Sequence, residues 1–260
     1  MPAPDSSSIV AIRLELRDGL AQITIDRPPL NVLDTDALRQ LNQALATCAS
    51  DEVRVVLLRS GVPRAFSAGV EIGDHTAARL PAMLDQVREQ ARRLLALNAL
   101  TIAVIHGATL GGGAELALLC DQVIAADDTT LGFPEIRLAA FPPIAAALLP
   151  ERYPWPVAMR LMLGESIGAA TAERLGLVST VVPRAQLDAA AAEQASAIAA
   201  GSGAALKALI AATRGQRAGA ILERLDAAIE TYRSVIAPSR DAQEGIDAFL
   251  QKRSPAWSHR

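Results

Sequence analysis

The chain has 260 residues, of which 51% are hydrophobic and 20% are charged, a composition typical of one large globular domain or of one domain with a smaller appendage. Its net charge of −3 gives no bulk electrostatic reason to expect binding to nucleic acid or to an anionic membrane. No window holds roughly 18 uninterrupted apolar residues and the N-terminus shows no signal-peptide pattern, so a cytoplasmic protein is expected.

The first half of the chain predicts alternating strands and helices. Residues 9–16 and 20–26 alternate apolar and polar side chains on either side of Asp18-Gly19, which is the pattern of a β-hairpin. Asp34 stands before a segment with apolar residues at helical spacing, so we expect it to cap a helix. The remaining elements expected here are a helix at 76–98, buried strands at 53–60 and 101–107, and short strands at 121–127 and 130–133.

The second half changes in character. From about residue 143 the chain predicts Ala-rich helices, interrupted at Gly201–Gly203, with a strand only at 178–182. We therefore expect an α/β body over residues 1–195 and a helical region over residues 196–260. The two cysteines, Cys48 and Cys120, lie in apolar stretches without metal-ligand spacing; buried free thiols and no metal site are expected.

Three consecutive glycines, Gly111 to Gly113, follow the strand at 101–107 and precede an apolar run with one carboxylate, Glu115. If a helix begins near Gly112, its first N–H groups have no partner inside the helix and can bind an anion or a developing oxyanion. A tight strand-to-helix turn with close packing would also explain the glycines. The run is neither a dinucleotide fingerprint, since Leu116 replaces the third glycine, nor a phosphate-binding loop ending in Gly-Lys-Ser/Thr.

Two further stretches follow predicted strands. "RAFSAGVEIGDH" (64–75) begins after the strand at 53–60, at the carboxyl end where open α/β folds bind ligands. "LGFPEIRL" (131–138) places Glu135 directly after a proline. Two glycine-containing loops and two glutamates, all following strands, form a more specific set than any one of them alone.

Together with "RPPLNVLD" (27–34) and "EGIDAFLQKRSPAW" (244–257), these motifs resemble the enoyl-CoA hydratase/isomerase, or crotonase, superfamily over nearly the whole chain. The resemblance implies a ββα spiral core with a C-terminal helical region that forms a trimer, often doubled to a hexamer. It implies an acyl-CoA substrate and no cofactor, because coenzyme A is part of the substrate.

The resemblance also assigns site residues. A thioester carbonyl would bind the backbone N–H groups of Val70 and Gly112, an oxyanion hole that stabilises the enolate. Glu115 and Glu135 would act on one water, with Glu135 delivering a proton to the α-carbon, as a coupled pair with one raised pKa. Contacts with the substrate or with CoA are expected along the body from Ala65, Ser67, Ala68 and Phe141. Further contacts are expected from Phe249 and Lys252 near the C-terminus, in a segment that closes the site of a neighbouring subunit. Lys252 could equally be an ordinary exposed lysine.

Both glutamates favour a hydro-lyase that adds water to an enoyl-CoA. "AAFPPIAA" (139–146) and "VEIGDHT" (70–76) depart from the common family pattern and are similar to cyclohexa-1,5-diene-1-carbonyl-CoA hydratases of anaerobic aromatic degradation. Asp74 and His75 would then lie near a ring substrate, or else cap the helix at Thr76. The alternatives are a short-chain 2-enoyl-CoA hydratase of β-oxidation, a Δ3,Δ2-enoyl-CoA isomerase, a thioester hydrolase or decarboxylase, and an RNA-binding relative, which the net charge disfavours.

Overall fold

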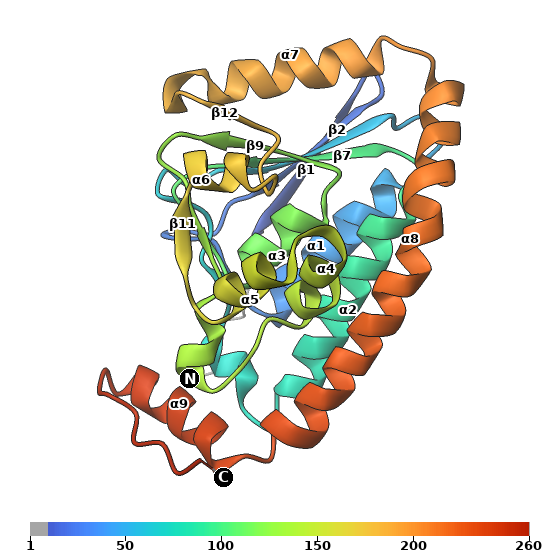
Figure 1. Ribbon diagram of the computed structural model, residues 1–260. Coiled ribbons are helices and arrows are strands. Elements are labelled where there is room, and N and C mark those ends of the chain that lie inside the picture. Colours follow the sequence, from blue (N-terminus) through green and yellow to red (C-terminus); the bar gives the residue numbers. More distant parts are fainter. Residues whose placement is uncertain (1–9, 260) are drawn as a thin grey trace, which may run out of the picture.

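The computed structural model describes residues 10–259, which form two main β-sheets surrounded by helices (Figure 1). The larger sheet has the order β1-β2-β4-β7-β9-β12, with β1 Ile12–Arg17, β2 Leu20–Ile25, β4 Val55–Ser60, β7 Leu100–Ile105, β9 Gln122–Ala126 and β12 Thr180–Val182. The smaller has the order β11-β10-β8-β5, with β11 Ser166–Gly168, β10 Thr130–Gly132, β8 Ala108–Leu110 and β5 Ala65–Ser67. A third pairing joins β3 Val32–Leu33 to β6 Gly69–Val70.

The chain winds between the two main sheets as a spiral. Three times a strand of the larger sheet is followed by a strand of the smaller one: β4 by β5, β7 by β8, and β9 by β10. Neighbours within the larger sheet are parallel except in the β1–β2 hairpin, where Ile12 pairs with Ile25. The spiral brings the chain segments that follow β5, β8 and β10 to one region, where the glycine loops and both glutamates lie.

The helices connect and cover these sheets. They are α1 Thr35–Cys48, α2 Leu80–Ala96, α3 Gly112–Leu119, α4 Pro143–Arg152, α5 Trp155–Met162, α6 Ala169–Arg174, α7 Leu187–Ala199, α8 Gly203–Thr231 and α9 Arg240–Leu250. Short 3₁₀ turns are η1 Ile72–His75, η2 Pro134–Leu138 and η3 Arg184–Gln186, and the turn η4, Tyr232–Ile236, is π-helical. No single helix among the described residues is long and apolar enough to cross a membrane. Two helical segments joined at a bend, residues 184–199 and 203–236, are long and apolar enough only when they are taken together.

Both faces of the larger sheet are buried. Alternate residues of β4 point in opposite directions: Val55 packs against α7, which covers one face (Figure 1), and Val56 packs into the main core on the other. The apolar side of α7 repeats every fourth residue, from Leu187 through Ala191 to Ala195, so one stripe of the helix meets the sheet. The expected boundary after residue 195 therefore falls inside α7, and the C-terminal region begins structurally at α8.

Most sequence-predicted elements are confirmed. The side chain of Asp34 accepts the N–H of Ala37 at 2.8 Å and caps α1 as expected, and Cys48 and Cys120 are buried and unpaired. The helix expected at 76–98 begins only at Leu80, so that Pro81 lies in its first turn, where the missing N–H costs no helical hydrogen bond. β8 and β11 were not predicted, because three residues are too few to show an alternating pattern.

Candidate active site

A cavity of about 530 Å³ lies between α2, α3, η2, η4 and α9. Its walls are mainly apolar, and α2 contributes the side of the helix that faces inward, with Leu80, Met83, Leu84 and Val87. Both predicted catalytic glutamates and both predicted oxyanion-hole residues line it. The structure thus brings together groups from three separate parts of the sequence, at position 70, in the first turn of α3 (positions 112 and 115) and at position 135.

At each of the three consecutive glycines a side chain would collide with a different neighbour. Gly111 has φ +51°, and a Cβ at this position would come within 2.6 Å of Oε1 of Glu135. A Cβ on Gly113 would lie 2.5 Å from the carbonyl oxygen of Ser67, so this glycine lets the start of α3 pack directly on β5. Close packing therefore explains Gly111 and Gly113, while the binding of an oxyanion at this loop stays a prediction.

The backbones of Val70 and Gly112 face each other across the cavity wall. A Cβ on Gly69 would lie 3.5 Å from the amide nitrogen of Gly112, and one on Gly112 would lie 3.6 Å from that of Val70. Gly112 is the first residue of α3, so its N–H has no acceptor within the helix, and the positive end of the helix dipole lies at the same point. Two adjacent amides beside an apolar cavity suit an oxygen that gains negative charge.

Glu115 lies in the first turn of α3 and is only 3% exposed. Burial raises its pKa, while a hydrogen bond from the N–H of Ala145 to its Oε1, at 2.9 Å, opposes part of this shift. That bond comes from α4, so the carboxylate is held between two helices. The hydrogen bond from a backbone N–H stabilises the ionised form of this carboxyl although its surroundings are apolar.

Glu135 lies in η2 and differs in its environment. Its Oε2 is buried and has no hydrogen-bond partner among the described residues. Burial and the neighbouring Glu115 both raise the pKa of Glu135. Of the two coupled carboxyls, Glu135 is therefore the one that keeps a proton near neutral pH, and Glu115 the one that ionises first.

The predicted CoA and acyl contacts divide into two groups. Ala68, Phe141 and Phe249 line the cavity, but Ala65, Ser67 and Lys252 do not. Ser67 is fully buried, and its hydroxyl donates to the carbonyl of Asn31 at 2.7 Å, so the side chain serves the fold.

Lys252 is exposed just beyond the end of α9, with φ +54°, which agrees with the alternative of an ordinary surface lysine. The cavity wall at this end is instead apolar. α9 turns Ala242, Ile246 and Phe249 toward it at helical spacing.

α9 covers the cavity of its own chain. It packs on η2 so closely that a Cβ on Gly245 would lie 2.3 Å from the carbonyl oxygen of Leu138. Within this chain α9 lines the cavity beside η2, at the lower end of the molecule in Figure 1, and the closing of a neighbouring subunit by the C-terminal segment stays a prediction.

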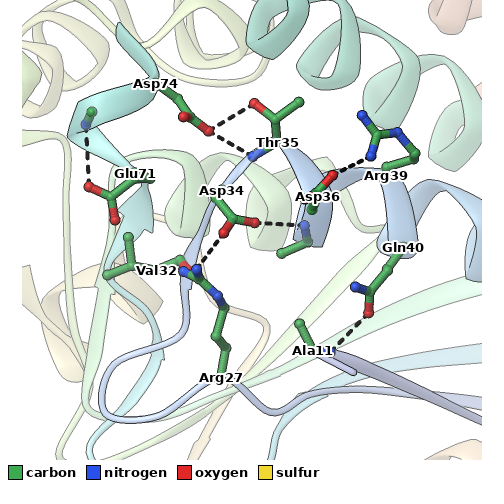
Figure 2. A network of polar contacts seen from close by, with 12 residues as sticks. Ala11, Arg27, Val32, Asp34, Thr35, Asp36, Arg39, Gln40, Glu71 and Asp74 are labelled. Carbon is green, nitrogen blue, oxygen red and sulfur yellow. Dashed lines mark hydrogen bonds and ion pairs between the residues drawn. The ribbon is translucent and has the colours of Figure 1, made fainter. Parts of the chain in front are cut away.

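Asp74 and His75, which the sequence left open, have separate environments. Asp74 is buried and accepts both the N–H and the hydroxyl of Thr35 at 2.8 Å, so it anchors the start of α1 (Figure 2). Figure 2 also shows Asp34 joined to Arg27 beside it. His75 lines the cavity, with Nδ1 3.1 Å from the carbonyl oxygen of Glu71, and burial lowers its pKa.

Sequence reasoning missed Tyr232, which follows α8 and lines the same cavity. Its ring packs against Phe141 with centroids 5.1 Å apart and planes inclined by 46°. The segment around it reads as an ordinary amphipathic helix end, and nothing in the spacing indicates that it returns to the glycine loop about 120 residues earlier.

Comparisons with known proteins agree with this geometry. The sequence profile of the family described as enoyl-CoA hydratase/isomerase matches residues 15–260. The chain belongs to the enoyl-CoA hydratase/isomerase family. The enzyme class expected from the sequence, an enoyl-CoA hydratase type of lyase, is confirmed with it.

Individual members of the family align with almost the whole of this chain. It is 32% identical to a cyclohexa-1,5-dienecarbonyl-CoA hydratase of Thauera aromatica, over 98% of this chain and 99% of that protein. It is 36% identical to a 2,3-dehydroadipyl-CoA hydratase of Escherichia coli (strain K12), over 92% and 94%. A crystal structure of an enoyl-CoA hydratase from Mycobacterium avium subsp. paratuberculosis K-10 superposes with a TM-score of 0.82 at 28% identity, covering 95% and 98%. The predicted crotonase-like α/β fold is confirmed.

Proposed function

We propose that this enzyme adds water to the conjugated double bond of a cyclic dienoyl-CoA, cyclohexa-1,5-diene-1-carbonyl-CoA. The observation that carries the proposal is the pair of buried glutamates with unequal environments, beside two facing backbone amides, in one apolar cavity. A hydratase needs a base for water and an acid for carbon at the same time, and this pair supplies one of each.

The reaction follows from the placement of these groups. The thioester carbonyl accepts the N–H groups of Val70 and Gly112. Ionised Glu115 removes a proton from water as the water oxygen bonds to the β-carbon, and the electron pair of the double bond moves onto the thioester oxygen as an enolate. Protonated Glu135 then gives its proton to the α-carbon, and the carbonyl re-forms.

The ring preference rests on the wall opposite the glycine loop. Phe141 lines the cavity and packs on Tyr232, while Pro142 and Pro143 begin α4. Proline restricts φ, so this wall is rigid, and a flat ring loses less conformational entropy on binding to it than a flexible chain does. The relative from Thauera aromatica carries the corresponding name.

Hydration of a linear 2-enoyl-CoA is the second candidate, because the relative with the higher identity of the two acts on 2,3-dehydroadipyl-CoA by its name. Δ3,Δ2-isomerisation is disfavoured, since it can proceed with one acid–base group and this site has two. Comparing kcat/KM for cyclohexadienoyl-CoA and crotonyl-CoA, by the absorbance of the conjugated system, distinguishes a cyclic acyl substrate from a linear one. Preference for crotonyl-CoA by tenfold or more would refute the cyclic substrate, and slow turnover of both, and of 2,3-dehydroadipyl-CoA, would refute hydration.

For the assembly, we propose a trimer or a hexamer made of two trimers. Large apolar side chains at Trp155, Leu209 and Leu250 are more than half exposed in the single chain, and an interface between copies would bury them. We also propose a cytoplasmic enzyme without a cofactor of its own; the two free cysteines fit a reducing compartment. Sedimentation of the purified chain tests the assembly.

A further inference from the structure

Tyr232 occupies an unusual place in the backbone. The N–H of Ala237 donates to its carbonyl oxygen at 2.9 Å, a bond across five residues that widens the end of α8 into a π-helical turn. Such turns are rare and occur frequently at functional sites. The turn carries Tyr232 to the cavity wall, where the residue is 3% exposed and packs on Phe141.

The hydroxyl of Tyr232 forms no hydrogen bond within residues 10–259, and it is not among the fully buried polar atoms, so it is open to the cavity that Tyr232 lines. Burial and the charges of Glu135 and Glu115 raise the pKa of this phenol, so that it stays protonated throughout the neutral range. It is therefore a neutral donor in the cavity that Glu115 and Glu135 also line, without an acceptor among the described residues.

The reaction water needs such a donor. A water between ionised Glu115 and protonated Glu135 gives one hydrogen to the carboxylate of Glu115 and the other to the carbonyl oxygen of the Glu135 carboxyl, whose O–H is needed for the α-carbon. Of the two lone pairs of the water, one must attack carbon while the other can accept a hydrogen bond. The wall after Glu135 offers little backbone help, since Pro142 and Pro143 have no N–H and the N–H of Ala145 already donates to Glu115.

We propose that Tyr232 is a positioning residue that donates a hydrogen bond to the attacking water and so directs its other lone pair at the β-carbon. This role rests on the proposed hydration. Tyr232 acts on the water alone and takes no part in proton transfer at the α-carbon, which belongs to Glu135 and the oxyanion hole.

The test compares two reactions in Tyr232→Phe. Hydration of an enoyl-CoA needs the attacking water, whereas exchange of the α-hydrogen of a saturated acyl-CoA in D₂O needs only the carboxyl group of Glu135 and the oxyanion hole. We expect kcat for hydration to fall about 10- to 100-fold, as for a lost hydrogen bond in the transition state, while KM and the exchange rate stay within about twofold. Tyr153→Phe is the matched control, because Tyr153 is the other tyrosine and lies outside the cavity; both of its rates should be unchanged.

Unchanged hydration in a folded Tyr232→Phe protein would overturn the proposal, and so would an equal loss of hydration and exchange, which would mean that Tyr232 only shapes the wall. A wild-type enzyme that exchanges the α-hydrogen but hydrates no enoyl-CoA would refute the proposed function instead, so the two failures are distinguishable.

Discussion

Replacing Glu135 with Gln should stabilise the folded protein at alkaline pH, although the substitution removes a proposed catalytic group. Burial and Glu115 raise the pKa of Glu135 from 4.5 to about 8. A raised carboxyl pKa favours the folded state while the group is protonated, and that contribution is lost as the pH rises through the folded-state value. At pH 9 the wild-type protein therefore holds a buried charge that the glutamine variant lacks.

The size of the effect follows from the shift. At about 1.4 kcal/mol for each pKa unit, the change from 4.5 to about 8 corresponds to an upper limit on the order of 5 kcal/mol. Structural relaxation and water entry reduce it, so we expect a gain of roughly 2–4 kcal/mol in the free energy of unfolding at pH 9. At pH 6, about 1.5 units above the unfolded-state pKa of 4.5, the same reasoning gives a gain of roughly 1–2 kcal/mol.

Urea unfolding at pH 6 and pH 9, at one protein concentration, measures this difference. Glu165→Gln is the control, because Glu165 is paired with Arg160 at the surface and its pKa is lowered, not raised. It should show the pH dependence of the wild type. If Glu135→Gln and the wild type lose the same stability between the two pH values, the carboxyl is not held protonated by its surroundings, and the assignment of acid and base loses its basis.

Two further predictions concern activity. The profile of kcat/KM against pH should be bell-shaped, with both apparent pKa values above the usual carboxyl range because burial raises them, since activity requires Glu115 ionised and Glu135 protonated; a profile flat from pH 5 to 10 would contradict this pairing. At the oxyanion hole, Val70→Ala makes room for a Cβ on residue 112, which would otherwise meet Cγ2 of Val70 at 2.8 Å. In that background Gly112→Pro, which removes the N–H, should be about 10²- to 10³-fold slower than Gly112→Ala, which keeps it; equal rates in two folded variants would place the oxyanion elsewhere.

Local features were predictable where a short stretch of sequence determines them. The hairpin, the cap at Asp34 and the glycine run each depend on residues close together in the chain, and the structure places them as expected. β8 lay outside this range, because three residues between Gly107 and Gly111 show no periodicity. The family resemblance added the pairing of Glu115 with Glu135, which no spacing in the sequence indicates.

Long-range features of the site could not be predicted in the same way. α9 carries an apolar face that could cover its own chain or another, and only the packing of Gly245 on Leu138 shows that it covers its own. Tyr232 looks like any aromatic residue near a helix end until the π-helical turn brings it to the cavity. Ser67 and Lys252 were expected at the substrate by their motif positions; the hydroxyl of Ser67 is used inside the fold, while Lys252 is exposed outside the cavity and its contact with CoA stays a prediction.

The most direct test of the account is the hydration rate of Glu115→Gln and Glu135→Gln, measured beside their affinity for a saturated acyl-CoA. Glutamine preserves the size of each side chain, and at position 115 its amide oxygen can still accept the N–H of Ala145. We predict that each variant loses about 10²- to 10⁴-fold in kcat while the Kd of the saturated acyl-CoA changes by less than about threefold. Near-wild-type hydration by either variant would contradict the claim that these two carboxylates carry the reaction.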